Sequence, residues 1–146
     1  MKRLNLLLLT LITATSSFAA DAWRFSAKTR TAEVKTAGAV LIVGCEMFNP
    51  TATALTIQLA GPNGMASSDV EKLTISADGR NKSIKMDFVS NAEGWKWSDS
   101  WPDWQGGMFK HLENASKLKV TLMGVGYDFP TTGLASSMQA LKKACT

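Results

Sequence analysis

The sequence predicts a mainly β fold, an antiparallel sandwich or a partly open barrel, with a short helix and a C-terminal helix stapled to the sheet by a disulfide. Three observations lead to this prediction. Several segments alternate apolar and polar residues with the period of a strand, one late segment has the apolar stripe of a helix, and both cysteines follow an export signal.

The export signal comes first in the chain. Two basic residues precede an apolar stretch over residues 4–14, and small residues occupy the peptidase positions up to Ala19. We expect cleavage after Ala19, which gives a signal peptide over residues 1–19 and a single exported β-rich domain over residues 20–146. The alternative is an uncleaved anchor, although the apolar stretch is shorter than the ~20 residues that span a bilayer.

Charge and hydropathy limit the class of partner. The formal net charge is +4, and two of those charges leave with Lys2 and Arg3, so the exported part carries +2. This charge is too small to predict binding to nucleic acid. No later segment is long and apolar enough for a membrane span after signal cleavage. We expect a periplasmic or secreted protein.

The exported part begins with segments that have the character of strands. Residues 23–33 alternate and are rich in threonine, which indicates an antiparallel strand with one wet face that leads into a hairpin. Residues 39–48 are apolar almost throughout, as in a strand covered on both faces, and residues 53–59 alternate again. The Gly-Pro-Asn-Gly sequence at residues 61–64 predicts a turn.

A hairpin is predicted around Asp78-Gly79. Residues 70–77 and 82–88 alternate on either side of this dipeptide. A type I′ turn needs positive φ at both central positions, and Asp-Gly is among the sequences that adopt it most readily.

Two helices are predicted later in the chain. Residues 107–115 carry apolar side chains at helical spacing, and residues 117–124 then return to the period of a strand. The second helix has one apolar stripe with spacings of four, three and four, formed by Leu134, Met138, Leu141 and Cys145. Thr131 or Thr132 can cap its start, and Lys142 and Lys143 suit the negative end of its dipole.

The cysteines are Cys45, in or just after an apolar strand, and Cys145, at the end of the helical stripe. Two thiols in an oxidising compartment favour a disulfide. We predict that Cys45 and Cys145 pair within one chain, and the alternative is a bond between two copies.

The segment from residue 95 to residue 104 holds four of the five tryptophans. Indoles beside carboxylates stack on sugar rings or anchor protein interfaces. The candidate binding surface consists of Trp95, Trp97, Asp99, Trp101, Asp103 and Trp104. The alternative is a structural role, in which Trp95 and Trp97 share one face of a strand and close the barrel or sandwich, and Trp101 and Trp104 cover one end of it.

Nothing in the sequence favours catalysis. His111, the single histidine, is interpreted as a solvated residue of the short helix, and no serine has a nucleophile motif. Asp99 and Asp103 could pair for glycoside cleavage, but their spacing does not fix a geometry. No cysteine or histidine cluster has metal-ligand spacing. We expect no enzyme, no catalytic residues, no metal and no cofactor.

The order of several features resembles the periplasmic VasI (TagO) proteins associated with type VI secretion. These features are Trp23, Cys45, Asp78-Gly79, Trp95-x-Trp97-Ser98, Met108-Phe109-x-x-Leu112, and the stretch from Phe129-x-x-x-Gly133-Leu134 to Ala144-Cys145. The chain departs from the family before its last helix, where Phe-Pro-Thr-Thr-Gly-Leu replaces a stretch resembling Asp-Leu-Ser-Gly-Leu.

The resemblance implies a non-enzymatic periplasmic accessory protein of a secretion system, with a protein partner in the cell envelope. The alternative is an envelope glycan-binding or hydrolase-inhibiting protein that engages peptidoglycan or a cell-wall hydrolase through the Trp95–Trp104 loop.

Overall fold

A computed structural model describes residues 21–45, 53–59, 70–90, 95–101 and 107–145. Within these residues, nine strands and two helices follow one another along the chain. Their bounds are β1 (Arg24–Ser26), β2 (Thr31–Thr36), β3 (Ala39–Cys45), β4 (Thr53–Leu59), β5 (Val70–Ala77), β6 (Arg80–Ser90), β7 (Trp95–Trp101), α1 (Met108–Leu112), β8 (Leu118–Leu122), β9 (Val125–Phe129) and α2 (Leu134–Cys145). The mainly β fold class, with its short helix and its disulfide-linked last helix, is confirmed.

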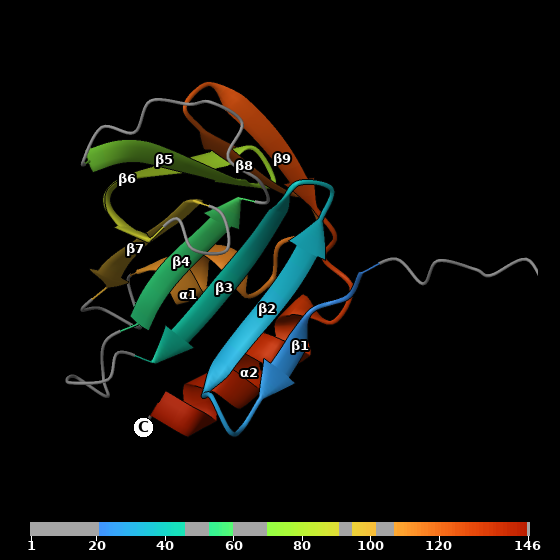
Figure 1. The fold of residues 1–146 in the computed structure, drawn as a ribbon. Coiled ribbons are helices and arrows are strands. Elements are labelled where there is room, and N and C mark those ends of the chain that lie inside the picture. The colour runs from blue at the N-terminus through green and yellow to red at the C-terminus, as the bar shows by residue number, and fades with distance from the viewer. Residues whose placement is uncertain (1–20, 46–52, 60–69, 91–94, 102–106, 146) are drawn as a thin grey trace, which may run out of the picture.

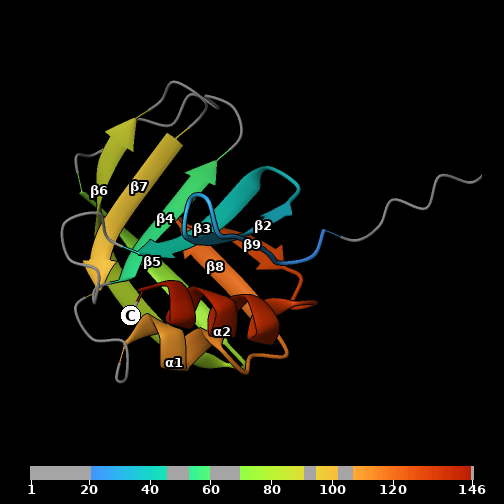
Figure 2. The same ribbon diagram turned by 90° about the horizontal axis from the view of Figure 1, so that it is seen from below.

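The strands form one antiparallel sheet in the order β1-β2-β3-β4-β7-β6-β5-β8-β9 (Figure 1). The sheet bends back on itself, so that β2 lies near β9, and Thr36 Oγ1 donates a hydrogen bond of 2.9 Å to the carbonyl oxygen of Asp128. Of the two predicted forms, the partly open barrel describes this arrangement. Both helices lie side by side over one end of the curled sheet (Figure 2).

The core fills the inside of the curled sheet and the space beneath the helices. Alternate residues of β2, β3, β5 and β8 are buried, as expected for strands with one wet face. In β3, Leu41 and Val43 are fully buried, whereas Val40 and Ile42 are partly exposed. The predicted covering of this strand is therefore complete on one face and partial on the other.

The predicted hairpin around Asp78-Gly79 is confirmed. Strands β5 and β6 pair from Ala77 and Arg80 outward, and the two turn residues have φ values of 51° and 79°. Both values fall in the left-handed region that a type I′ turn requires. The sequence signal and the backbone geometry agree at this position.

Two strand predictions differ from the structure. Residues 23–33 do not form one strand, because a turn over residues 27–30 separates β1 from β2 and Arg30 takes a φ of 54°. Strand β9 was not predicted at all. It follows a Met123-Gly124 turn with φ values of 51° and 78°, the geometry of the Asp-Gly turn with a methionine in first place. Methionine is not among the residues that favour turns, so the sequence pattern does not predict this hairpin.

Three predictions fall partly or wholly beyond the described residues. The strand over residues 39–48 is confirmed as far as Cys45, and its last three residues are not described. The turn predicted at residues 61–64 lies wholly outside the described residues. Residues 1–20 also lie outside the description, so the signal peptide and its boundary at Ala19 stay predictions.

The predicted apolar stripe of α2 is confirmed, because its four residues are at most 1% exposed. Of the two threonines expected to cap it, Thr131 has another role, since its hydroxyl donates to the carbonyl oxygen of Ser116, and a cap from Thr132 stays a prediction. The first turn of the helix is organised by Gly133, whose carbonyl oxygen accepts from Ser137 N at 3.0 Å and from Ser136 Oγ at 3.1 Å.

Trp23, which is far from α2 along the chain, holds the start of this helix in place. Its backbone N–H donates to the carbonyl oxygen of Thr132, and its indole N–H donates to that of Pro130, each at 2.9 Å. The side chain is only 4% exposed. Gly133 lies against it with a φ of 76°, and a Cβ there would stand 3.0 Å from the carbonyl oxygen of Trp23.

The close approach of Gly133 to Trp23 predicts a stability difference between two glycine substitutions. Gly124 has nearly the same φ, 78°, but a Cβ there would meet nothing within 4 Å. Gly124→Ala should lower the free energy of unfolding by roughly 1 to 2 kcal/mol through backbone strain alone. Gly133→Ala should lose about 1 kcal/mol more, because the new methyl group also crowds Trp23. Urea denaturation followed by circular dichroism measures both, and equal losses would contradict the contact.

Candidate functional site

The two cysteines form a disulfide within one chain. Cys45 ends β3, Cys145 ends α2, and their Cα atoms are 5.4 Å apart across a sequence separation of 100 residues. The predicted pairing of Cys45 with Cys145 is confirmed, and the alternative of a bond between two copies is not what the structure shows. Cys145 is fully buried and Cys45 partly so. The bond is consistent with an oxidising environment.

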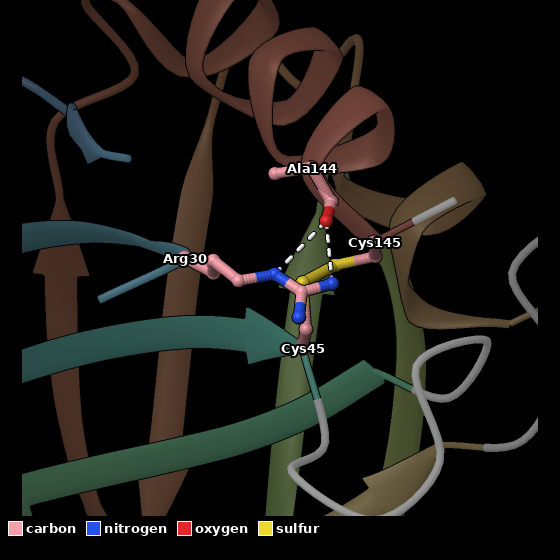
Figure 3. The surroundings of a disulfide bond; sticks show 4 residues. All are labelled: Arg30, Cys45, Ala144 and Cys145. Carbon is pink, nitrogen blue, oxygen red and sulfur yellow. Dashed lines mark hydrogen bonds between the residues drawn. A yellow bond between two sulfur atoms is a disulfide. The ribbon is translucent and has the colours of Figure 1, made fainter. Parts of the chain in front are cut away.

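Arg30 lies beside this disulfide (Figure 3). Its Nε and Nη2 atoms donate to the carbonyl oxygen of Ala144 at 2.9 and 2.5 Å, and its own carbonyl oxygen accepts from Cys45 N at 3.2 Å. A cation at the end of α2 also suits the negative end of the helix dipole. No sequence pattern indicates this role of Arg30, because its partners lie 15 and 114 residues away along the chain.

His111 is a structural residue. From α1, its Nε2 atom donates to the carbonyl oxygen of Ile75 on β5 at 3.1 Å, and the side chain is partly buried. Burial is the main cause that lowers the pKa of His111, and the positive charges of Arg80 and Lys82 act in the same direction. The interpretation of His111 as a solvated residue is therefore wrong, because this side chain attaches α1 to the sheet.

Asp78 joins the β5–β6 turn to the chain before β8. Its carboxylate accepts from the Ser116 hydroxyl at 2.7 Å, from Ser116 N at 3.0 Å and from Lys117 N at 2.8 Å. The pKa of Asp78 is lowered, chiefly by the hydrogen bond from the Ser116 side chain. The sequence predicts only a turn role for Asp78. Its second role, as acceptor for Ser116, depends on a residue 38 positions away, so no local sequence pattern predicts it.

The predicted binding surface lies on β7 and in the residues after it. Trp95, Trp97, Asp99 and Trp101 occupy alternate positions of this strand, so that part of the predicted loop is a strand. Their side chains lie beyond what the structure describes, as do Asp103 and Trp104 entirely. Their role in binding stays a prediction.

The backbone of β7 is paired with β4 over its whole length and with β6 at residues 96–98. It lies between β4 and β6, and Trp97 is in register with Ile57 on one side and Phe88 on the other. Ile57 in turn is in register with Leu41 of β3. Because β7 lies inside the sheet and is not an edge strand, it is poorly suited to the addition of an extended peptide, and we expect recognition by the segment to depend on its side chains.

Two hollows in the described surface differ in size and lining. One of about 130 Å³ is lined by Asp21, Ala22, Arg24, Glu33, Val34 and Lys35. An open one of about 550 Å³ runs along α2 and is lined by Ser136, Gln139, Ala140, Lys142 and Lys143. Within the described ranges, no three residues of the histidine, cysteine, aspartate and glutamate types come together as a metal site would require. None of the helices there is long and apolar enough to cross a membrane.

Comparison with known proteins returned no match to any family model, curated protein or solved structure. The resemblance to VasI proteins therefore depends on the sequence features alone.

The burial of His111 predicts a pH dependence of stability. A lowered pKa means that the unfolded chain binds a proton more readily than the folded chain, so folding is favoured above the ordinary histidine value of about 6.5. The free energy of unfolding should decrease as pH falls from 7.5 to 5. His111→Gln keeps a donor for Ile75 but does not titrate, and should flatten this part of the profile. Urea titrations at several pH values measure both proteins, and identical slopes would refute the assignment.

Asp78 should make the free energy of unfolding depend on pH in a lower range than His111 does. Because its folded pKa is lowered, it stabilises the fold above the ordinary carboxyl value, and this contribution is lost as pH falls through the folded value. Asp78→Asn retains the positive φ but removes the charge and one acceptor oxygen. It should destabilise the protein at pH 7, and the difference from the wild type should shrink below about pH 4.

Asp128→Asn is the matched control for Asp78→Asn. It removes an exposed carboxylate from β9, and the Asp128 atom that accepts a hydrogen bond from Thr36 is the backbone oxygen, which the substitution leaves in place. The free energy of unfolding should change by less than about 0.5 kcal/mol. A loss as large as that of Asp78→Asn would mean that general charge, not the contacts to Ser116 and Lys117, explains the effect.

Proposed function

We propose that this protein is a non-enzymatic accessory protein of the cell envelope, in a secretion apparatus of the type VI kind, and that it acts by binding a protein partner. The Cys45–Cys145 disulfide carries the proposal, because it attaches the last helix to the sheet and suits an oxidising compartment. The sequence supplies an export signal and the resemblance to VasI proteins.

The contacts made by the histidine and the two cysteines support a role in binding. The chain has one histidine and two cysteines. His111 is bonded to the carbonyl oxygen of Ile75 and has a lowered pKa, and both cysteines are consumed in the disulfide. Nucleophilic catalysis by cysteine needs a free thiolate, and histidine acts as a base through an accessible ring nitrogen. Here these groups are used to hold the fold.

The second candidate is an envelope glycan-binding or hydrolase-inhibiting protein that uses Trp95, Trp97, Asp99, Trp101, Asp103 and Trp104. The pairing of β7 on both edges favours it over peptide-strand addition, because stacking on sugar rings needs side chains and no free backbone.

Cross-linking in the native envelope tests the leading proposal. The source cell would express the full chain with an affinity tag, and cross-linked partners would be identified by mass spectrometry. We expect a mature N-terminus at Ala20 and enrichment of secretion components over a tagged, exported control protein. Recovery in the cytoplasm with an intact signal, or equal recovery of secretion components with the control, would refute the proposal.

Pelleting with insoluble peptidoglycan tests the second candidate. Trp95→Ala should reduce the bound fraction if this segment binds glycan, whereas Trp23→Phe, which changes a tryptophan outside the segment, should not. Circular dichroism must show that both variants are folded. Absence of the wild-type protein from the pellet would refute direct peptidoglycan binding and leave the leading proposal unaffected.

A further inference from the structure

One residue contacts the chain segments of both cysteines. Arg30, in the turn between β1 and β2, receives a hydrogen bond from Cys45 N through its carbonyl oxygen, and its guanidinium donates twice to the carbonyl oxygen of Ala144, next to Cys145 (Figure 3). None of these three hydrogen bonds involves a sulfur atom. They can therefore form in the reduced chain as well as in the oxidised one.

The backbone of Arg30 is in a conformation that arginine does not favour. Its φ is 54°, in the left-handed region where glycine and asparagine are the preferred residues. Asp78 and Met123 also have positive φ, but each precedes a glycine in a hairpin turn, whereas Arg30 precedes Thr31 at the start of a strand. A strained residue persists when its surroundings hold it there. The contacts of the Arg30 side chain with α2 supply such a constraint.

The chemistry of disulfide formation gives this contact a role. The thiolate is the reactive form of cysteine, and a neighbouring cation favours it. In the reduced chain, the Arg30 guanidinium would lie at the end of α2 beside both cysteine residues. Two groups held side by side react as if at high local concentration.

We propose that Arg30 is a positioning residue for the formation of the Cys45–Cys145 disulfide. Its contacts hold the end of α2 against the end of β3 before the bond exists. One cysteine thiolate attacks a disulfide oxidant and releases one of its thiolates. The second cysteine thiolate then attacks the mixed disulfide, forms the Cys45–Cys145 bond and releases the other. Two electrons pass to the oxidant, and the two thiol protons go to the solvent or to the released thiolates.

Arg30→Gly separates this role from general stability. Glycine relieves the positive φ, so the reduced protein should remain folded, while both hydrogen bonds to Ala144 are lost. The reduced protein would be mixed with oxidised glutathione, quenched by alkylation at intervals and analysed by mass spectrometry. We expect the internal bond to form roughly tenfold more slowly than in the wild type, because each lost hydrogen bond involves a charged donor. Disulfide-linked dimers should accumulate in its place.

Two further variants sharpen the comparison. Arg30→Lys keeps a cation and one donor, and should recover most of the wild-type rate. Lys28→Ala removes an exposed cation from the same turn, and should leave the rate unchanged. A pH profile adds a readout that stability alone would not move, since the wild-type rate should rise at a lower pH than that of Arg30→Gly as the thiolates form.

The proposal fails if Arg30→Gly, folded in its reduced form, oxidises as fast as the wild type. It also fails if Lys28→Ala slows the reaction as much as Arg30→Gly. If circular dichroism shows that reduced Arg30→Gly is unfolded, Arg30→Lys decides instead. A folded Arg30→Lys protein, which keeps the cation but not the paired guanidinium donors, must then oxidise more slowly than folded Lys28→Ala, and equal rates of these two variants would overturn the proposal.

Discussion

The attachment of α2 at both of its ends is the constraint on which the rest of the structure depends. At its start, Trp23 bonds to the carbonyl oxygens of Pro130 and Thr132, and at its end, Arg30 bonds to that of Ala144 beside the disulfide. The segment from residue 23 to residue 30 therefore runs the length of the helix. It also contains β1, so the same contacts place the first strand of the sheet and the last helix together.

The apolar stripe of α2 and the disulfide contribute on a similar scale. Leu134, Met138 and Leu141 are at most 1% exposed, and burying side chains of this size is worth about 1.5 to 3 kcal/mol each. The chain-entropy model gives a disulfide that closes a loop of about 100 residues roughly 4 to 5 kcal/mol. The stripe therefore favours docking of the helix independently of the disulfide, and the disulfide adds stability to the same contact. This comparison is the reason to expect a folded reduced state.

Local signals predicted those parts of the fold that local interactions determine. Asp78-Gly79 and the stripe of α2 each specify their geometry within a few residues, and a chain with two cysteines offers a single pairing within one molecule. The roles that were missed all depend on partners far along the chain. Asp78 bonds to Ser116, His111 to Ile75 and Arg30 to Ala144, at separations of 38, 36 and 114 residues. A pattern within a short window contains no information about such pairs.

The side chains best suited to chemistry are also those that connect distant parts of this fold. His111, Asp78 and the two cysteines each join segments that are at least 36 residues apart, so a reaction that used them would loosen the structure that positions them. The part of the tryptophan segment that forms β7 is placed differently, since this strand lies inside the sheet between β4 and β6. A strand held in this way has a fixed backbone before any partner arrives, which lowers the ordering cost of binding. Recognition by side chains of β7 would therefore start from a backbone that the sheet already holds in place.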